Sequence, residues 1–203
     1  MSELQSRPVE LRRAYPRSVS LGDATQVKLR LMDPGDVHRL LVFARSLPED
    51  DLQFLRVDIT KMLVVMLWAQ NIKAGQTVTV LAEKEREVVG YASVHHDQVS
   101  WQRHLGELRI QVAPAYRGKG LGTLLGREIF AIAPDIGVEK IVAHMTPNQQ
   151  QAMALVKRSG FRHEALLHDF VIDRNGRKND LVVMTHDVAA RAGEARAPAG
   201  AAP

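Results

Sequence analysis

Apolar side chains recur along this chain with two different periods, and the two periods separate strands from helices. Alternating apolar and basic residues over 27–32 (VKLRLM) predict a half-buried strand. Farther along, apolar residues fall at i, i+4, i+8 and i+11, which is one face of an amphipathic helix: Leu121, Leu125, Ile129 and Ile132. Such segments follow one another from residue 27 to residue 187 without an internal repeat, so we expect a single domain over 27–187.

Capping residues, glycine and proline divide the first half of this domain. Asp33-Pro34 begins a helix with aspartate as N-cap and proline at the first helical position, and Leu47-Pro48 ends it. A less regular helical region opens at 49–51, and a third helical segment covers 61–74. Two strands then flank the charged turn 83–87, which is a β-hairpin signal; the strands are 77–82 and 88–95.

The second half contains strands at 107–112 and 140–145, separated by the amphipathic helix. A further helix starts at 146–148 and ends before Gly160, a typical C′ glycine. The Asn-Gly pair at 175–176 predicts a hairpin between strands 161–173 and 181–186. The expected order is β-αα-βββ-α-β-α-ββ, an α/β (α+β) fold with a mixed central sheet flanked by helices. We expect antiparallel pairing at the hairpins and parallel or splayed pairing where strands flank helices.

Composition limits the class of protein and its environment. The 203 residues are 45% hydrophobic and 25% charged, with no cysteine, which excludes a disulfide framework, a thiolate nucleophile and a zinc–cysteine site. The net charge of +4 comes from scattered basic residues rather than a stripe, so we expect no nucleic-acid partner. The longest apolar run, 62–69, is too short to span a bilayer, and no apolar signal region opens the chain; a cytoplasmic location is expected.

The two ends lack sustained periodicity. Residues 1–26 are polar and are expected to form a flexible lead-in, with room for one short element. Residues 188–203 are rich in alanine, glycine and proline, which predicts a disordered tail.

The candidate chemistry centres on a glycine-rich turn between the strand 107–112 and the amphipathic helix. Gly118, Gly120 and Gly122 occupy every second position, where glycine lets backbone approach a ligand closely. A helix N-terminus directly after them presents free N–H groups and favours an anion. Lys119 is followed by glycine rather than serine or threonine, which excludes a Walker loop, and the spacing is not GxGxxG. The turn is predicted to hold a phosphate or pyrophosphate.

The pattern Arg117-x-x-Gly120-x-Gly122, preceded by VAPAY, resembles the acyl-CoA pyrophosphate loop of the GNAT N-acetyltransferase superfamily. Two further stretches are similar to that family in the right order, ALVKRSGF at 154–161 and DLVVM at 180–184. The resemblance covers about 27–187 and implies the GNAT fold, with acetyl-CoA as co-substrate and an amine as acceptor. The acetyl-CoA contacts that it implies are Ile110, Val112, Arg117, Gly118, Lys119, Gly120, Leu121, Gly122, Thr123 and Asn148.

Amine acetylation requires removal of a proton, because a lysine-like amine has a pKa of about 10.4 and is mostly protonated near neutrality. GELRIQV at 106–112 is similar to the strand before the loop in bacterial protein-lysine acetyltransferases, and this implies Glu107 as the base. A solvated carboxylate paired with Arg103 or Arg109 is an equally weighted alternative. The family also implies an oxyanion donor among the backbone N–H groups around Val112.

The sequence departs from the family's pattern in the final helix. Many members place a tyrosine there to protonate the leaving thiolate, and this chain has Val156 at that position. A CoA thiol is acidic enough, compared with about 8.5 for cysteine, that turnover does not require this acid. Asn148 lies one residue earlier than the asparagine that contacts the pantetheine arm in relatives, so a helix N-cap is the favoured interpretation of that residue.

Several histidines surround the segment where a substrate would bind. His95, His96 and His104 could contact substrate or act as an auxiliary base. A metal site is not expected, because neighbouring residues 95 and 96 of a strand point to opposite faces. His144, near the end of its strand, could face the cleft, but a surface or core position is favoured. Trp101 is either a substrate wall or an aromatic that closes a loop.

Two functions of different classes follow. The first is transfer of an acetyl group from acetyl-CoA to a primary amine, either a small molecule or a protein lysine, by direct attack in a ternary complex. The alternative is a non-catalytic acyl-CoA-binding regulatory module, which the missing tyrosine leaves open. The sequence does not select among lysine, polyamine, aminoglycoside and amino acid. Any assembly is expected to be a homodimer, because dimers are the commonest oligomers.

Overall fold

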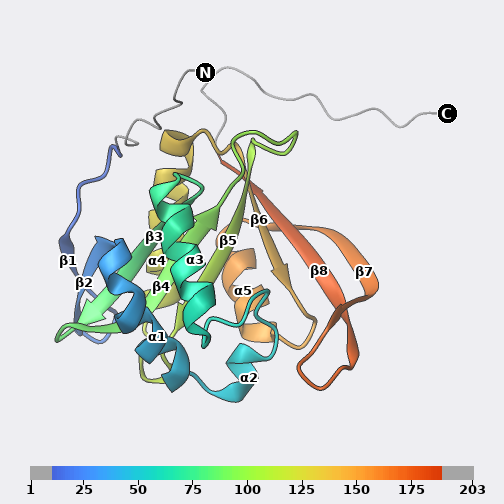
Figure 1. Cartoon of the computed structure of the whole chain (residues 1–203), viewed down its shortest axis with the longest axis horizontal. Helices are drawn as coiled ribbons and strands as arrows, with labels where there is room; N and C mark the ends of the chain where they lie inside the picture. The colour runs from blue at the N-terminus through green and yellow to red at the C-terminus, as the bar shows by residue number, and fades with distance from the viewer. Residues whose placement is uncertain (1–10, 189–203) are drawn as a thin grey trace.

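A computed structural model describes residues 11–188. An eight-stranded sheet crosses the molecule in the order β1-β2-β3-β4-β5-β6-β8-β7, with helices on both faces (Figure 1). The strands are β1 Arg17–Ser20, β2 Gln26–Leu31, β3 Thr77–Lys84, β4 Glu87–His95, β5 Leu105–Val112, β6 Lys140–Met145, β7 Arg162–Ile172 and β8 Lys178–Asp187. The α-helices are α1 Val37–Ser46, α2 Glu49–Leu52, α3 Met62–Lys73, α4 Leu121–Ile132 and α5 Gln150–Arg158, and short 3₁₀ turns cover Pro34–Asp36, Pro114–Tyr116 and Ala133–Ile136.

The pairing of β5 with β6 is the feature that creates the site. All other neighbouring strands pair antiparallel, whereas β5 and β6 run parallel and pair only at Leu105, Gly106 and Glu107. Beyond Glu107 the two strands separate, and Figure 1 shows them spreading apart below their common upper end. The prediction of a mixed sheet that is antiparallel at its hairpins and splayed between helices is confirmed.

Two apolar cores cover the two faces of the sheet. Helices α1 and α3 pack on one face around Tyr91, whose ring meets Phe43 and Trp68 edge to face at centroid distances of 6.1 and 4.9 Å. Helix α4 packs on the other face through the predicted stripe of Leu121, Leu125, Ile129 and Ile132, all fully buried. Within residues 11–188 no helix combines the length and the apolar character needed to cross a membrane.

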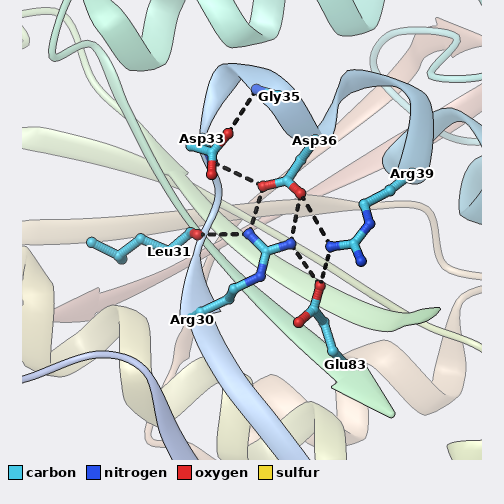
Figure 2. Close-up of polar contacts among 7 residues, drawn as sticks. All are labelled: Arg30, Leu31, Asp33, Gly35, Asp36, Arg39 and Glu83. Carbon is cyan, nitrogen blue, oxygen red and sulfur yellow. Dashed lines mark hydrogen bonds and ion pairs between the residues drawn. The ribbon is translucent and has the colours of Figure 1, made fainter. Parts of the chain in front are cut away.

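An ion-pair network fixes the start of α1 against the sheet (Figure 2). Asp33 caps the 3₁₀ turn as predicted, accepting a hydrogen bond from the N–H of Gly35 at 2.7 Å, and the N–H of Asp33 donates to Asp36 in return. Arg30 of β2 bridges Asp36 and Glu83 of β3, and Arg39 of α1 also donates to Glu83. The buried carboxylates therefore each have cationic partners, as buried charge requires.

The N-terminal segment differs from the expected flexible lead-in where it is described. Residues 17–20 form the edge strand β1, which pairs antiparallel with β2. Arg13 of the segment before β1 and Arg17 of β1 both form ion pairs with the fully buried Glu128 of α4. No sustained hydrophobic period is visible here because a four-residue edge strand is too short to display one. Residues 1–10 of the predicted lead-in and 189–203 of the predicted tail lie outside the described part.

Candidate active site

A cavity of about 480 Å³ opens where β5 and β6 separate. One wall is α5, through Ala152, Leu155 and Val156. The opposite wall is the segment 53–56 after α2, together with the end of β7. Because α5 packs with α4 and residues 52 and 55 pack with α1 and α3, the cavity has walls from both sides of the sheet. Two molecules, one from each side of the sheet, could therefore meet in this cavity.

Backbone donors line this gap. In the β4–β5 ladder the N–H of Ala113 donates to Val89, so the odd-numbered residues of β5 direct their hydrogen bonds toward β4. The even-numbered residues Ile110 and Val112 therefore direct their N–H groups toward β6, which no longer pairs at that level. A carbonyl oxygen in the gap would find these donors fixed in place. The oxyanion donor predicted around Val112 fits this geometry.

The glycine turn lies at the end of β5 and runs into α4. Gly118 and Gly120 have φ values of +74° and +89°, which L-residues with a side chain rarely adopt. A Cβ at either position would meet no heavy atom within 4 Å, so both face open space. Among residues 11–188 no side chain caps α4, whose N-cap is Gly120 itself, and the first N–H groups of the helix are therefore available to an anion.

The two cations of the turn are held by carboxylates from other segments. Arg117 forms an ion pair with Asp51 of α2, and its Nε donates to the carbonyl of Val112 at 3.1 Å. Lys119 pairs with Asp23 at 2.9 Å, and its carbonyl accepts from the N–H of Gly22 at 3.1 Å. The hydrogen bond from Lys119 lowers the pKa of Asp23 well below its usual range. A bound diphosphate would take both cations from these carboxylates.

Glu107 lies at the point where β5 and β6 part, and it lines the cavity. Its Oε2 accepts from Arg56 Nη1 at 2.8 Å and its Oε1 accepts from Arg109 Nε at 3.0 Å. The Glu107 side chain is 18% exposed and that of Arg109 25%, whereas Arg56 is 61% exposed. The predicted base is thus a carboxylate held between two guanidinium groups, of which only Arg56 projects into solvent.

His144 of β6 is the fourth titratable group in the cavity wall. It lies two residues after Val142, the partner of Glu107, and so on the same face of the sheet. Burial, with the charges of Arg56 and Arg109, lowers its pKa, although Glu107 acts in the opposite direction. His144 is therefore a neutral imidazole at neutral pH.

His95 is the antiparallel partner of Glu107 on β4, but its ring contacts hydroxyl groups of the neighbouring strand residues and does not line the cavity. Its Nδ1 lies 3.0 Å from Thr77 Oγ1 and its Nε2 lies 2.8 Å from Ser93 Oγ. Burial, assisted by the charges of Arg109 and Arg56, lowers the pKa of His95 to about 3. Both ring nitrogens are occupied by hydroxyl groups, so this imidazole is not placed to act as a base.

The two remaining candidate histidines, His96 and His104, line a second cavity of about 460 Å³. His96 is buried, and both its ring nitrogens lack a hydrogen-bond partner among the described residues. His104 and Trp101 line the same cavity, and Trp101 is 86% exposed. The structure thus separates His96, His104 and Trp101 from Glu107. Within residues 11–188 no three His, Asp or Glu side chains lie close enough to hold a metal ion.

A family comparison agrees with this geometry. The model described as the acetyltransferase (GNAT) family matches residues 44–161, more than half of the chain, and includes the glycine turn and α5. The chain belongs to the acetyltransferase (GNAT) family. The curated relative YwnH of Bacillus subtilis (strain 168), provisionally named a phosphinothricin acetyltransferase, is 27% identical over 82 residues. That match covers 40% of this chain and spans half the length of YwnH.

Solved GNAT structures share the fold over their full lengths. A ribosomal-protein-alanine N-acetyltransferase from Brucella melitensis is 25% identical, with a TM-score of 0.68, and the match covers 78% of this chain and 98% of that one. A GNAT phosphinothricin acetyltransferase from Sinorhizobium meliloti, solved in complex with AcCoA, is 21% identical with a TM-score of 0.70. That match covers 85% of this chain and 94% of the other. The predicted GNAT fold is confirmed.

The residues assigned to acetyl-CoA by family resemblance fall into different environments in this GNAT domain. Ile110 lines the cavity, whereas the Leu121 side chain is fully buried and leaves only its backbone for a ligand. Gly122 allows α4 to approach α5, because a Cβ there would lie 2.8 Å from Leu155. Thr123 follows in the first turn of α4. Asn148 is exposed and is not in the cavity wall, and the N-cap of α5 is Gln149 rather than Asn148.

Thr146 is a cavity residue that sequence reasoning missed. It is 2% exposed, lines the cavity, and its Oγ1 has no hydrogen-bond partner among the described residues. Its N–H donates to Gln149 Oε1 at 2.9 Å, which fixes the turn between β6 and α5. In the sequence, the Thr-Pro pair at 146–147 indicates only the start of a helix. A buried hydroxyl without a protein partner is unusual, and either a water or a ligand group in the cavity would satisfy it.

Proposed function

We propose that this protein is an N-acetyltransferase that moves the acetyl group of acetyl-CoA to a primary amine. The observation that carries the proposal is that three features adjoin one another along β5: the glycine turn, the free N–H groups of the strand, and the cavity between β5 and β6. The diphosphate would bind at the N-terminus of α4 with Arg117 and Lys119, as helix N-termini bind anions. The pantetheine arm would then follow the gap past Ile110, Val112 and Thr146.

Direct attack accounts for the transfer without an acyl-enzyme. The amine nitrogen attacks the thioester carbon, the C–N bond forms, the C–S bond breaks, and CoA leaves as thiolate. The N–H groups of Ile110 and Val112 would stabilise the oxyanion of the tetrahedral intermediate. Glu107 would accept the proton that the ammonium group must lose, directly or through water. Val156 offers no proton, so solvent would protonate the thiolate. The CoA thiol is acidic enough that its thiolate is a good leaving group.

A non-catalytic acyl-CoA-binding module is the second candidate. The pairing of Glu107 with Arg56 and Arg109 favours it, because both carboxylate oxygens already accept hydrogen bonds. Such a module would bind acetyl-CoA and transfer nothing. The relatives are named for different acceptors, so their names do not identify the amine here. A cytoplasmic location and a homodimeric assembly remain predictions.

Calorimetric binding of acetyl-CoA, with CoA and ATP as comparison ligands, tests the common part of both candidates. Gly120→Glu introduces a negative charge into the turn and requires a residue with a side chain to adopt the positive φ of Gly120. We expect it to abolish binding. Gly176→Glu is the matched control, because Gly176 also has positive φ (+77°) and open space around it but lies in the β7–β8 turn. Absence of acetyl-CoA binding by the unmodified protein would contradict both functions.

Turnover then separates the two functions. With an amine library and detection of released CoA thiol, an enzyme should release CoA only when an amine is present. Glu107→Gln should bind acetyl-CoA as before and lose about 100-fold or more in kcat, the usual contribution of a general base. A module would show acetyl-CoA binding with no amine-dependent release of CoA.

A further inference from the structure

The part of the cavity around Glu107, where the acceptor amine would lie, carries more positive than negative charge. The titratable groups of its wall are Arg56, Arg109, Glu107 and His144. With His144 neutral, two guanidinium groups face one carboxylate. Each arginine uses one N–H on Glu107, and a guanidinium has five such donors. Donors with positive charge therefore remain available beside the predicted base.

We propose that the acceptor is a small amine that also carries an anionic group, a free amino acid in the simplest case. This rests on the proposed acetyl transfer and names its substrate class. The anionic group would bind Arg56 and Arg109, since guanidinium groups bind carboxylates with paired, charge-assisted hydrogen bonds. The ammonium group would lie against Glu107. A zwitterion therefore satisfies all three charges, whereas a simple amine satisfies only the carboxylate.

The same arrangement couples recognition to proton transfer. While Arg56 and Arg109 both donate to Glu107, protonation of Glu107 would weaken two charge-assisted hydrogen bonds and is therefore unfavourable. Arg56 is the mobile partner, because its side chain is 61% exposed and lies in the turn region after α2 rather than in a strand. A substrate carboxylate would draw Arg56 away, which leaves Glu107 with Arg109 alone and open to the ammonium group. An amine without an anionic group would leave Glu107 fully paired.

Apolar side chains indicate the rest of the acceptor. Phe54 and Leu55 form the wall on the α2 side, and Phe170 and Ile172 form the wall on β7. Phe170 and Ile172 are 62% and 67% exposed, so an apolar substrate body would cover surface that is otherwise in water. Polyamines and aminoglycosides carry several positive charges, and the net positive charge of this wall disfavours them.

Matched acceptor pairs test the proposal directly. Leucine and leucinamide, and phenylalanine and phenylalaninamide, differ in the carboxylate and share the apolar body. The amide's amine has a pKa near that of a peptide α-amino group, about 7.7–8.0, so intrinsic reactivity favours the amide. We expect kcat/KM to be at least about tenfold higher for the amino acid, the value of one charge-assisted hydrogen bond. Spermidine and a lysine peptide blocked at both ends serve as cationic comparisons.

Arg56→Gln supplies the second measurement. We expect it to lower kcat/KM for leucine by about 10- to 100-fold and to leave leucinamide unchanged or improved, because Glu107 loses a competing partner. Arg103→Gln is the control, since Arg103 lines the second cavity. A reduction that is equal for leucine and leucinamide would indicate a merely structural effect and would overturn the assignment of Arg56.

The failures of the two proposals are distinguishable. Efficient acetylation of leucinamide, spermidine or the blocked lysine peptide, with leucine and phenylalanine inert, would overturn the zwitterion assignment and retain the acetyltransferase. Acetyl-CoA binding without acetylation of any acceptor would contradict acetyl transfer and with it the substrate class.

Discussion

The hydroxyl of Tyr15 donates a 2.7 Å hydrogen bond to Glu128, although 113 positions separate the two residues in the sequence. Glu128 lies on α4, the helix that presents the glycine turn at its N-terminus, and Arg13 and Arg17 bind the same carboxylate. Burial and the neighbouring Glu128 carboxylate raise the pKa of Tyr15 above its ordinary value. The N-terminal segment thereby fixes the helix that would bind the cofactor diphosphate.

Glu128→Gln should lower the free energy of unfolding by about 2 kcal/mol or more, because it leaves two arginines beside a buried neutral amide. Denaturant unfolding measures this loss. Glu85→Gln is the control: Glu85 is largely exposed, and its one ion pair within the described part of the chain is with Lys84 at 3.9 Å, so its removal should cost less than about 0.5 kcal/mol. Equal unfolding midpoints for the two variants would show that the buried network contributes nothing.

Asp51→Asn should raise the affinity for acetyl-CoA by about three- to tenfold. The Asp51 carboxylate competes with the diphosphate for Arg117, and a partly exposed ion pair amounts to about 1 kcal/mol. Calorimetry at several salt concentrations provides the measurement. The neighbouring Asp50 is exposed, and Asp50→Asn controls for the change in net charge. Weaker binding by Asp51→Asn would mean that Asp51 organises the loop for the ligand instead of competing with it.

Thr146→Val should weaken acetyl-CoA binding by about five- to tenfold while leaving stability equal or slightly higher. The substitution keeps the shape and removes a buried hydroxyl that has no partner among the described residues, so no protein hydrogen bond is lost and a contact to the bound ligand would be. Thr79→Val is the contrasting control, because Thr79 Oγ1 accepts from Trp68 Nε1 at 3.0 Å. That variant should lose stability without losing affinity. Unchanged affinity in Thr146→Val would exclude the hydroxyl from the ligand site.

His95 should make the protein less stable as the pH falls below neutrality. Its pKa is about 3 when folded and about 6.5 when unfolded, so the unfolded state binds the extra proton first. The stabilisation is complete above pH 6.5 and is lost toward pH 3, at up to about 1.4 kcal/mol per pH unit. Unfolding from pH 7 to 4.5 measures the slope, and His95→Gln, which cannot titrate, should flatten it. Identical slopes would contradict the neutral, doubly hydrogen-bonded His95.

Local sequence was sufficient for much of the fold. The strand at 140–145 and the cap at Asp33 were predicted correctly because they depend on periodicity and capping chemistry within a few residues. The predicted strand at 107–112 begins two residues earlier, at Leu105, since Gly106 packs within the sheet where a Cβ would lie 2.6 Å from Val94. One short element was expected within 1–26, but its position as the edge strand β1 was not predicted, since a four-residue strand leaves no periodic pattern.

The sequence by itself determined the family and the position of the glycine turn, because glycine spacing, proline and the helix that follows act over short distances. Only the tertiary structure decided which groups surround the reacting centre. Arg56 and Glu107 are 51 positions apart, and no local pattern encodes their contact. The same holds for the separation of His96 and His104 from Glu107, which depends on where β5 leaves β6. The sequence shows which residues have reactive side chains, but the register and the separation of the strands determine which of these residues come together in a site.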